Sequence, residues 1–343
     1  MAASVQDRSM QLSAMLPFAM VFGGCMSAVI AMEYVLKANP KAGNLLSISE
    51  FAFVLVQSFP GRVDKAGLRP LRMPLQSHLH HAVLWVSMSV LANVAFGFNI
   101  SVPIHTLFRS CNVIASVLLG YLVFGQLYSL KQLVCVLLIT VGIFLGSVGD
   151  AKQFFCTDCG GLPGAAHGEE GFLRWSFGIL LLVFVQLLQG FLGHTQAMLY
   201  RRHEGCGSKG ELAEEFLFTS HVVSFLPFVF LWEDVAAAGR LAVASPPLFS
   251  WLPIPSQILF FTANNLCQLV CIKGVFRLSA HFSPLTVNIT LSVRKFLSVV
   301  LSILWFGNPW TFLHSMATVT IFGGVFAYSQ CPPVESKKDE KKE

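Results

Sequence analysis

The stretch SVRKFLSVVLSILWFG, residues 292–307, decides the fold, because it places two cations inside a long apolar segment. The sequence is otherwise apolar from Phe282 to Phe306, and a helix of that length crosses about 30 Å of hydrocarbon. Arg294 and Lys295 lie near the middle of the segment. A charge at the bilayer centre costs between about 2.5 and more than 10 kcal/mol, so such residues normally face a water-filled cavity or a partner.

The same stretch repeats an earlier part of the chain, SCNVIASVLLGYLVFG at residues 110–125. When residues 110–147 are moved onto 292–329, eleven of 38 positions are identical without a gap. Leu, Val and Phe matches are common in apolar sequence, but the aligned Ser, Phe-Gly and Gly positions are more specific. The match pairs the fourth and fifth apolar segments with the ninth and tenth. Because five spans per half is an odd number, the halves must be inverted, which is a common transporter plan with a site near the midplane.

Composition indicates a membrane protein over the whole chain. Hydrophobic residues make up 54% of the chain and charged residues 12%, and the mean hydropathy is +0.65; a soluble domain carries about a quarter charged residues. The polar connections are too short to form a soluble core. Ten apolar segments are long enough to span the bilayer, at approximately residues 14–36, 44–60, 80–101, 104–125, 130–149, 175–199, 214–232, 253–272, 282–305 and 311–330.

We therefore expect an all-α polytopic membrane protein with ten transmembrane helices in two inverted five-helix repeats. Alternate connections, taken with both termini, hold fifteen Lys and Arg residues, whereas the other connections hold five. This bias places both termini in the cytosol, and it explains the net charge of +5 without a nucleic-acid partner. The expected parts are a first repeat, a lumenal connecting loop, a second repeat and a basic cytosolic tail, at residues 1–149, 150–174, 175–330 and 331–343.

A third cation within the spans, Arg109, favours an anion site. It lies one turn before Asn112, which the repeat aligns with Arg294, so the two halves bring polar groups to comparable depth. An ion pair with Glu33 or Glu50 is the alternative, and Arg109 can also extend toward the interface. Three cations against two acids leave an excess of positive charge, and Arg together with Lys suits a phosphate ester.

Other polar residues at membrane depth have two interpretations. His221 and the pair Asn264-Asn265 are hydrogen-bonding groups that either contact a ligand or join helices. Gly142 and Gly146 form a GxxxG pattern that favours packing, within the bundle or at a homodimer face.

The His and Cys residues indicate no metal or cofactor. His78, His80 and His81 lie at the N-terminal end of the third segment, where a solvated cluster at the interface is favoured over a metal site. The pair Cys156-x-x-Cys159 has no second Cys/His pair nearby, so we expect no zinc site. Cys267 and Cys271 are one helical turn apart within the eighth segment and are interpreted as apolar filler.

Several stretches resemble nucleotide-sugar transporters of the drug/metabolite transporter superfamily, above all the UDP-N-acetylglucosamine/UDP-xylose transporter branch. The similar stretches include PIHTLFRSCNVIASVLLG (103–120), NNLCQLVCIKGVF (264–276) and LTVNITLSVRKFLSVVLSILWFGNPW (285–310). In related GDP-mannose carriers the motif Gly-Ala-Leu-Asn-Lys falls on Leu291 to Lys295. A second motif, Phe-Tyr-Asn-Asn or Phe-Tyr-Asn-His, falls on Phe218 to His221, where Thr and Ser replace Tyr and Asn.

The resemblance implies an antiporter that moves a UDP-sugar into the Golgi or endoplasmic reticulum lumen and returns UMP. Its partners would be these two substrates, the lipid bilayer and, functionally, lumenal glycosyltransferases. Adjacent helical positions point about 100° apart, so we expect one cation to grip the phosphates, and Lys295 takes the family's Lys position. The candidate substrate-binding residues are Lys295, Arg294, Arg109, Ser220, His221, Glu33 and Asn265.

Three rival functions stay open. The nearest is a carrier of the same fold for another nucleotide sugar or a phosphorylated metabolite. The replacements at Thr219 and Ser220 in the second motif leave this alternative open. An intramembrane enzyme is disfavoured, because the sequence has no HExxH, no GxSxG and no paired acids at helical spacing within a span. A scaffold without transport activity is disfavoured by the cations within the spans.

Overall fold

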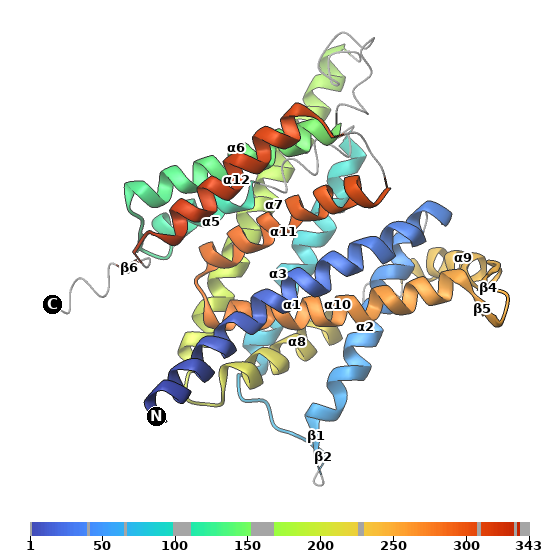
Figure 1. Cartoon of the computed structure of the whole chain (residues 1–343), viewed down its shortest axis with the longest axis horizontal. Helices are drawn as coiled ribbons and strands as arrows, with labels where there is room; N and C mark the ends of the chain where they lie inside the picture. The colour runs from blue at the N-terminus through green and yellow to red at the C-terminus, as the bar shows by residue number, and fades with distance from the viewer. Residues whose placement is uncertain are drawn as a thin grey trace. The chain divides into compact units, whose positions relative to one another are not determined.

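The computed structural model describes residues 2–39, 42–64, 67–98, 111–151, 168–225, 230–306, 310–332 and 335–336, and these residues are mostly helical (Figure 1). The helices are α1 (Ala2–Ala38), α2 (Gly43–Ser58), α3 (Leu75–Val94), α5 (Asn112–Leu122), α6 (Leu130–Ala151), α7 (Gly168–Arg202), α8 (Lys209–Phe225), α9 (Trp232–Val243), α10 (Ser256–His281), α11 (Pro284–Phe306) and α12 (Phe312–Ser329). The short elements are the 3₁₀ helices η1 (Phe59–Arg62) and η2 (Ala95–Phe98) and the strands β1 (Val63–Asp64), β2 (Gly67–Leu68), β3 (Gln126–Leu127), β4 (Pro247–Phe249), β5 (Leu252–Pro255) and β6 (Glu335–Ser336).

Each of the ten predicted apolar segments overlaps a helix, so the all-α prediction is confirmed. Within the described ranges, four helices are long and apolar enough to cross a membrane: Met15–Ala38, Ser176–Arg202, Ser256–His281 and Phe312–Ser329. Two shorter apolar helices cover Asn112–Leu122 and Leu130–Gly146. The count of ten spans, the inverted repeat and the cytosolic termini remain predictions.

The connections contain more structure than their polar composition indicates. Strands β1 and β2 pair antiparallel between α2 and α3, and Gly67, the first residue of β2, has a φ of +113°. Between α8 and α10, the helix α9 precedes a hairpin of β4 and β5. Helix α9 has Glu233 and Asp234 in its first turn and Arg240 in its last, an arrangement that complements the helix dipole. Helix α8 covers the seventh predicted segment as far as Phe225, and residues 226–229 of that segment lie outside the described residues.

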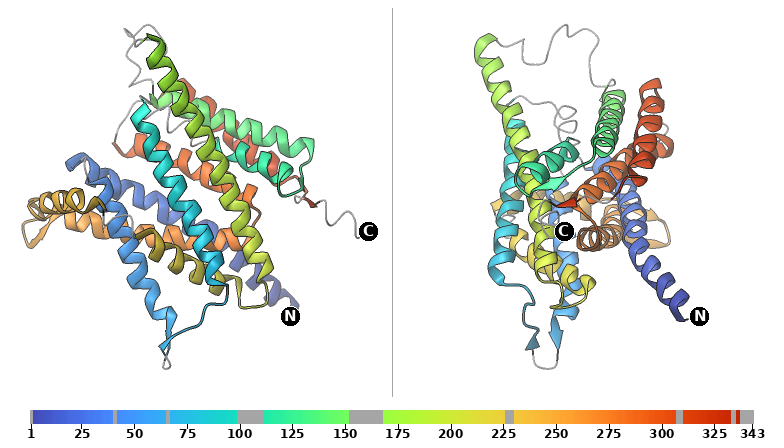
Figure 2. Two further views of the ribbon diagram at one scale, coloured as in Figure 1. Left: turned by 180° about the vertical axis from the view of Figure 1, so that it is seen from behind. Right: turned by 90° about the vertical axis from the view of Figure 1, so that its left-hand side faces the viewer.

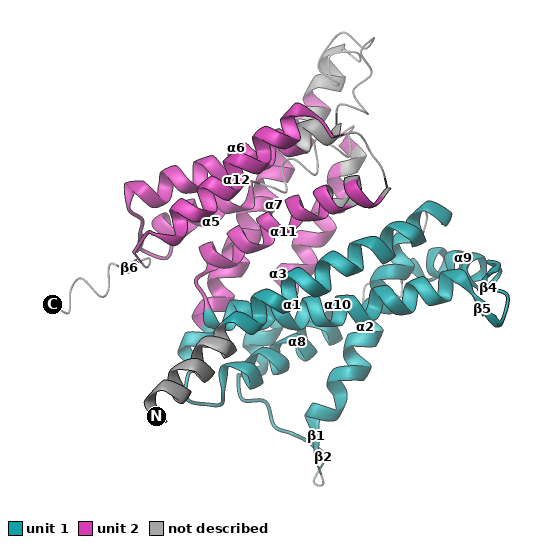
Figure 3. Cartoon of the chain, viewed as in Figure 1, with its two compact units in different colours: residues 1–82, 199–281 teal, residues 83–198, 282–343 magenta. Residues whose placement is uncertain are grey.

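The chain divides into two compact units (Figure 3), each described by itself. Unit 1 comprises residues 1–82 and 199–281, and unit 2 comprises residues 83–198 and 282–343. Each unit therefore combines part of the first predicted repeat with part of the second. Two helices, α3 and α7, have residues in both units, because the divisions fall within them.

In unit 1, helix α1 packs along α10 at very short distance (Figures 1 and 2). Gly24 permits this approach, since a Cβ there would lie 2.6 Å from the backbone nitrogen of Cys271. Gly274 does the same from α10, where a Cβ would lie 2.8 Å from Met20 Cβ. A disulfide joins Cys25 to Cys271 across the two helices. The interpretation of Cys271 as apolar filler was therefore wrong, because its partner is 246 residues away in the sequence.

In unit 2, helices α6 and α12 pack through a reciprocal contact between repeated residues (Figures 1 and 2). A Cβ on Gly142 would lie 2.6 Å from Ile321 Cγ1, and a Cβ on Gly324 would lie 2.8 Å from Ile139 Cγ1. The repeat aligns Ile139 with Ile321 and Gly142 with Gly324. Such an exchange of partners is what two copies related by a two-fold axis produce. It places the Gly142 face of α6 inside unit 2 instead of at a homodimer surface.

Part of the predicted C-terminal tail is held by unit 2. Strand β6 pairs antiparallel with β3, opposing Ser336 to Gln126. Gln132 Nε2 also donates a hydrogen bond of 2.8 Å to the carbonyl oxygen of Pro332. The tail therefore begins at a fixed point beside the connection between α5 and α6, while residues 337–343 lie outside the described part.

Candidate substrate-binding residues

The structure distributes the predicted site residues over both units. Glu33 lies on α1, Ser220 and His221 on α8, and Asn265 on α10, all in unit 1. Arg294 and Lys295 lie on α11 in unit 2. Arg109 lies outside the described residues, as does the pair Cys156 and Cys159.

One face of α11 carries a line of polar residues in unit 2. Asn288, Ser292 and Lys295 follow at spacings of four and three residues, which places them on the same side of a helix. Asn288 and Ser292 are buried, and Lys295 is half-buried. Arg294 is offset by about 100° from its neighbour Lys295, so it points away from this line.

Helix α5 supplies the group that completes this polar face. Asn112 is 1% exposed, and its Nδ2 donates to Asn288 Oδ1 at 3.3 Å. Its own Oδ1 accepts a hydrogen bond of 3.3 Å from Ser292 Oγ. Asn112 is therefore held in one orientation by two residues of α11. The three amide and hydroxyl groups join α5 to α11 without any charged residue.

Helix α7 contributes two buried polar side chains to unit 2. His194 Nε2 lies 2.8 Å from the carbonyl oxygen of Ser116, and its ring stacks on Phe124 with centroids 4.7 Å apart. These contacts hold α7 against α5 and the residues that follow it. Gln186 is 4% exposed, and neither of its amide atoms has a hydrogen-bond partner within the described part of the chain. A buried amide in this state requires an explanation, and sequence reasoning missed it.

In unit 1, helices α2 and α10 meet through a carboxylate and four polar side chains. Glu50 Oε1 accepts a hydrogen bond of 2.8 Å from Asn264 Nδ2, and its Oε2 accepts one of 3.4 Å from Gln268 Nε2. Ser49 Oγ donates to Asn265 Oδ1 at 3.2 Å. The hydrogen bonds of Asn264 and Asn265 thus join two helices, which is the second of the two interpretations offered for them.

The remaining unit 1 candidates differ in their surroundings. Glu33 lies 3.2 Å from Lys37 on the next turn of α1. His221 is 1% exposed; its Nδ1 lies 2.7 Å from the carbonyl oxygen of Leu217, and its ring meets Phe51 edge-on. Ser220 is fully buried, and its Oγ has no hydrogen-bond partner among the described residues.

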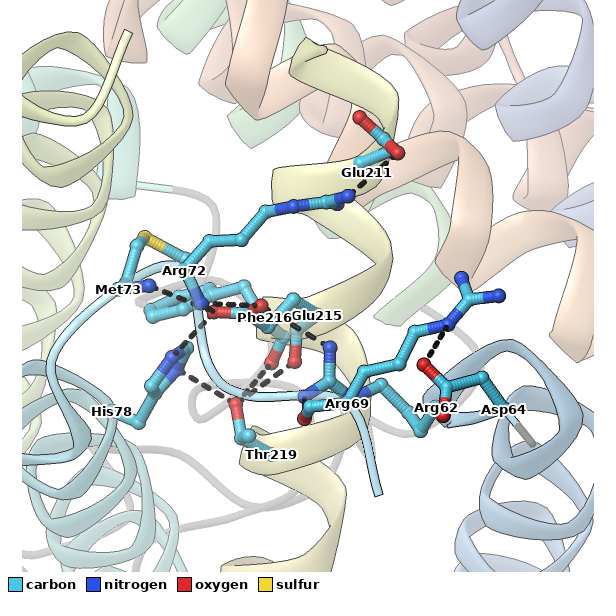
Figure 4. Close-up of polar contacts among 10 residues, drawn as sticks. All are labelled: Arg62, Asp64, Arg69, Arg72, Met73, His78, Glu211, Glu215, Phe216 and Thr219. Carbon is cyan, nitrogen blue, oxygen red and sulfur yellow. Dashed lines mark hydrogen bonds and ion pairs between the residues drawn. The ribbon is translucent and has the colours of Figure 1, made fainter. Parts of the chain in front are cut away.

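A buried carboxylate that the sequence did not identify lies in the second turn of α8 (Figure 4). Glu215 is 1% exposed and accepts hydrogen bonds from the backbone N–H groups of Arg72, at 2.9 Å to its Oε2, and Met73, at 3.0 Å to its Oε1. Arg62 Nη1 lies 3.2 Å from the same Oε2, and His78 Nε2 lies 3.2 Å from Oε1. We call Glu215, Arg62, His78 and Thr219 the Glu215 cluster, because Thr219 Oγ1 lies 2.7 Å from His78 Nδ1.

The burial of these histidines corrects one prediction. His78 is 1% exposed and His81 is 6% exposed, so only His80 fits the solvated cluster expected from the sequence. The rings of His78 and His81 both lie against Phe216, with centroids 5.2 and 4.4 Å away. Among the described residues, no group of three His, Cys, Asp or Glu side chains is arranged to hold a metal ion.

Two further acids of α8 are tied to other elements. Ser208 and Glu211 form a capping box, in which each side chain accepts a hydrogen bond from the backbone of the other. The Ser208 backbone N–H and the Arg72 guanidinium hold the pKa of the exposed Glu211 carboxyl below its usual value. Glu214 instead lies 2.9 Å from Arg277 and 3.3 Å from Lys273 on α10.

Comparisons with known proteins agree on one family. The family model described as the UAA transporter family matches residues 13–331. A relative from Danio rerio, named UDP-xylose and UDP-N-acetylglucosamine transporter, is 32% identical over 91% of this chain and 92% of its own. A relative from Drosophila melanogaster, named endoplasmic reticulum GDP-fucose transporter, is 28% identical over 94% of this chain and 91% of its own. A solved crystal structure with 12% identity shares the fold over 93% of this chain and 97% of its own, with a TM-score of 0.62.

Proposed function

Because this chain belongs to the UAA transporter family of nucleotide-sugar transporters, we propose that it is an antiporter exchanging a UDP-sugar for UMP. The sugar nucleotide is UDP-N-acetylglucosamine or UDP-xylose, and the membrane is that of the Golgi or the endoplasmic reticulum. Two relatives support this choice: one is named for both UDP-sugars, and another is named for the endoplasmic reticulum. The family is one of transporters and not of enzymes.

The observation that carries the proposal is the polar face of α11. Lys295 follows Asn288 and Ser292 on one side of the helix, next to the amide of Asn112. This face combines a cation with amide and hydroxyl groups, which are the groups that bind a phosphate and a sugar or base. Lys295 would hold the diphosphate, and Arg294, offset by about 100°, would contact the ribose or an acid.

Two buried groups without hydrogen-bond partners extend the proposed site. Gln186 on α7 and Ser220 on α8 each hold a polar atom that the described part of the chain leaves unsatisfied. A bound sugar nucleotide offers hydroxyl, carbonyl and imide groups that satisfy such atoms, and leaving them unpaired is costly. We propose both as substrate contacts, together with His221, Asn265, Glu33 and Arg109.

Exchange follows from the charge within the predicted spans. Apart from the first two residues of each span, the sequence holds three cations there against the two acids Glu33 and Glu50. Glu214 and Glu215, the first two residues of the seventh span, lie 2.9 Å from Arg277 and 3.2 Å from Arg62 and so leave the excess unchanged. Moving an empty cationic site through its occluded state is costly. An anion bound in each direction removes that cost, so we propose obligate exchange in a carrier of two inverted halves with cytosolic termini.

Uptake into proteoliposomes tests the proposal. Vesicles loaded with UMP are compared with empty vesicles for uptake of labelled UDP-N-acetylglucosamine, UDP-xylose and GDP-fucose. We expect fast uptake of at least one UDP-sugar only into UMP-loaded vesicles. Equal rates into loaded and empty vesicles would contradict exchange, and a preference for GDP-fucose would favour the function named for the Drosophila relative.

Topology is tested separately in cells. A tag at either terminus should be accessible from the cytosol, and a tag placed within residues 150–174 should be protected. Lumenal termini would show that the orientation predicted from the positive charges is wrong.

A further inference from the structure

The Glu215 cluster concentrates more polar contacts on one buried carboxylate than packing requires. Glu215 accepts from two backbone N–H groups, from the Arg62 guanidinium and from the His78 ring (Figure 4). A buried charge is tolerated only when partners compensate for the loss of water. Here the partners come from η1, from the segment that precedes α3 and from the first turn of α3 itself. The carboxylate therefore attaches the connection between α2 and α3 to α8.

The cluster ends on a helix that leads out of unit 1. His78 lies in the first turn of α3, and the division between the units follows Ala82, one turn later. Helix α3 then continues in unit 2 to Val94. The contacts of His78 with Glu215 and Thr219 thus attach the unit 1 end of a helix that both units share.

Thr219 gives this attachment a second contact point. Its Oγ1 lies 2.7 Å from His78 Nδ1 and 3.0 Å from the carbonyl oxygen of Glu215. In the motif that the chain resembles, this position holds Tyr. In this protein the side chain of Thr219 contacts α3, while the neighbouring Ser220 is buried with its hydroxyl unpartnered within the described residues. The two replaced positions of the motif therefore have different surroundings.

We propose that Glu215 is a positioning residue for the transport step: with Arg62, His78 and Thr219 it anchors the unit 1 end of α3. The proposal rests on the proposed transport function. An alternating-access carrier rearranges its helices in every cycle, and a helix shared by two units transmits such a change only if its ends are fixed. Weakening the anchor lets the first turn of α3 move by itself. A weaker anchor therefore slows the reorientation of the carrier and leaves substrate binding intact.

The test separates turnover from affinity in purified protein. Glu215→Gln keeps the shape of the side chain but removes the charge that Arg62 and His78 contact. Since a hydrogen bond to a charged group is a strong one, we expect exchange turnover per folded molecule to fall about ten-fold. The dissociation constant of UMP should stay within about two-fold. Glu214→Gln is the matched control, because this neighbouring carboxylate contacts only α10 residues in the ion pairs of the structure, and its turnover should match wild type.

A milder pair of variants keeps the test decisive if Glu215→Gln folds poorly. Thr219→Val removes only the hydroxyl at His78, and Thr262→Val removes an exposed hydroxyl that bonds to its own helix at Ile258. We expect slower turnover with unchanged UMP affinity for the first variant and no change for the second. Wild-type turnover in folded Thr219→Val would overturn the proposal. A lower affinity for UMP with wild-type turnover would also overturn the proposal, because the Glu215 cluster would then affect substrate binding and not the transport step. If the wild-type protein bound no nucleotide, the proposed function would fail instead.

Discussion

The two units differ in how their acidic and basic residues are distributed. In unit 1 the acids lie beside basic or amide side chains: Glu33 with Lys37, Glu50 with Asn264, Glu214 with Arg277 and Glu215 with Arg62. In unit 2, the stretches 83–149, 171–198 and 282–334 contain no Asp or Glu in their sequence, and Asp150, Glu169 and Glu170 lie just beyond them, at one end of α6 and of α7. These stretches contain five cations, namely Arg109, Lys131, Arg174, Arg294 and Lys295.

The difference shows how each unit is held together and what is left for a ligand. Unit 1 joins its helices through charged contacts around α8 and α10, so the charges of Glu214 and Glu215 serve packing. Unit 2 joins α5 to α11 through Asn112, Asn288 and Ser292, and α6 to α12 through the reciprocal glycine contact. These contacts are neutral, and an anion entering unit 2 meets five cations in stretches whose sequence holds no Asp or Glu.

The largest effect should come from breaking a buried charge contact in unit 1. Arg62→Met leaves Glu215 without its guanidinium partner, and removing one partner of a buried pair costs about 3–5 kcal/mol. Thermal unfolding in detergent measures the loss. Arg69→Met is the control, since Arg69 is half exposed and lies 3.8 Å from Asp64 at the surface, where a pair contributes at most about 1 kcal/mol. Equal stability of the two variants would show that the Glu215 cluster is not a structural centre of unit 1.

The corresponding change in unit 2 should affect binding instead of stability. Lys295→Ala should lower the affinity for UMP by ten- to a hundred-fold, because a charge-assisted hydrogen bond contributes about 1.5–3 kcal/mol. Transport should be lost while the unfolding temperature stays close to wild type. Lys295→Arg should restore only part of the affinity, since a planar guanidinium does not replace a point charge.

Lys131→Ala provides the control for this experiment. Lys131 belongs to the same unit but is exposed at the start of α6, so its removal should leave UMP affinity unchanged. A variant of Lys295 that binds UMP normally but unfolds at lower temperature would place Lys295 among the structural residues. The contrast between the units would then disappear.

The reciprocal contact of α6 and α12 predicts matched effects at two distant positions. Gly142→Ala and Gly324→Ala each place a methyl group against an isoleucine of the other helix, and overpacking of this kind costs about 1–3 kcal/mol. Gly323→Ala is the control, because a Cβ at Gly323 meets no atom within 4 Å. Thermal unfolding should show similar losses for the first two variants and none for the third. A large difference between Gly142→Ala and Gly324→Ala would break the symmetry inferred from the sequence repeat.

The sequence predicted the helices well because lipid requires long apolar segments with all backbone groups bonded internally. It missed α9, whose amphipathic pattern is short, since Val235, Ala238 and Ala242 are its only fully buried residues. It also missed the disulfide and the Glu215 cluster. These depend on pairings across 246 and up to 153 residues, which no local pattern records.

For the candidate site, the sequence predicted which polar residues lie within the spans better than it predicted their hydrogen-bond partners. The cations of α11 and the spacing of Asn288, Ser292 and Lys295 can be read directly from the sequence. The hydrogen bonds of Glu50 with Asn264 and Gln268 cannot be predicted from the sequence, because they depend on how α2 and α10 pack. Gln186 gives only a weak signal, a polar residue in an apolar segment, and its unsatisfied amide becomes visible only in the structure.

The smallest effect should come from the exposed charge of Glu211 in unit 1. Glu211→Gln keeps an acceptor for the Ser208 backbone N–H but loses the ionic contact with Arg72. The pKa of Glu211 is lowered in the folded protein, so its charge stabilises the fold above its unfolded pKa, and that contribution is lost as the pH falls through the folded pKa. The variant should therefore unfold at a slightly lower temperature than wild type at pH 7. This difference should vanish below the folded pKa and should also shrink at high salt.

Glu204→Gln is the control for this variant. Its carboxylate lies 3.7 Å from Lys209 at the surface and makes no capping box, so the unfolding temperature should change less than in Glu211→Gln. A Glu211→Gln effect as large as that of Arg62→Met would mean that exposed and buried charges contribute alike in unit 1, and burial would no longer explain the role of Glu215.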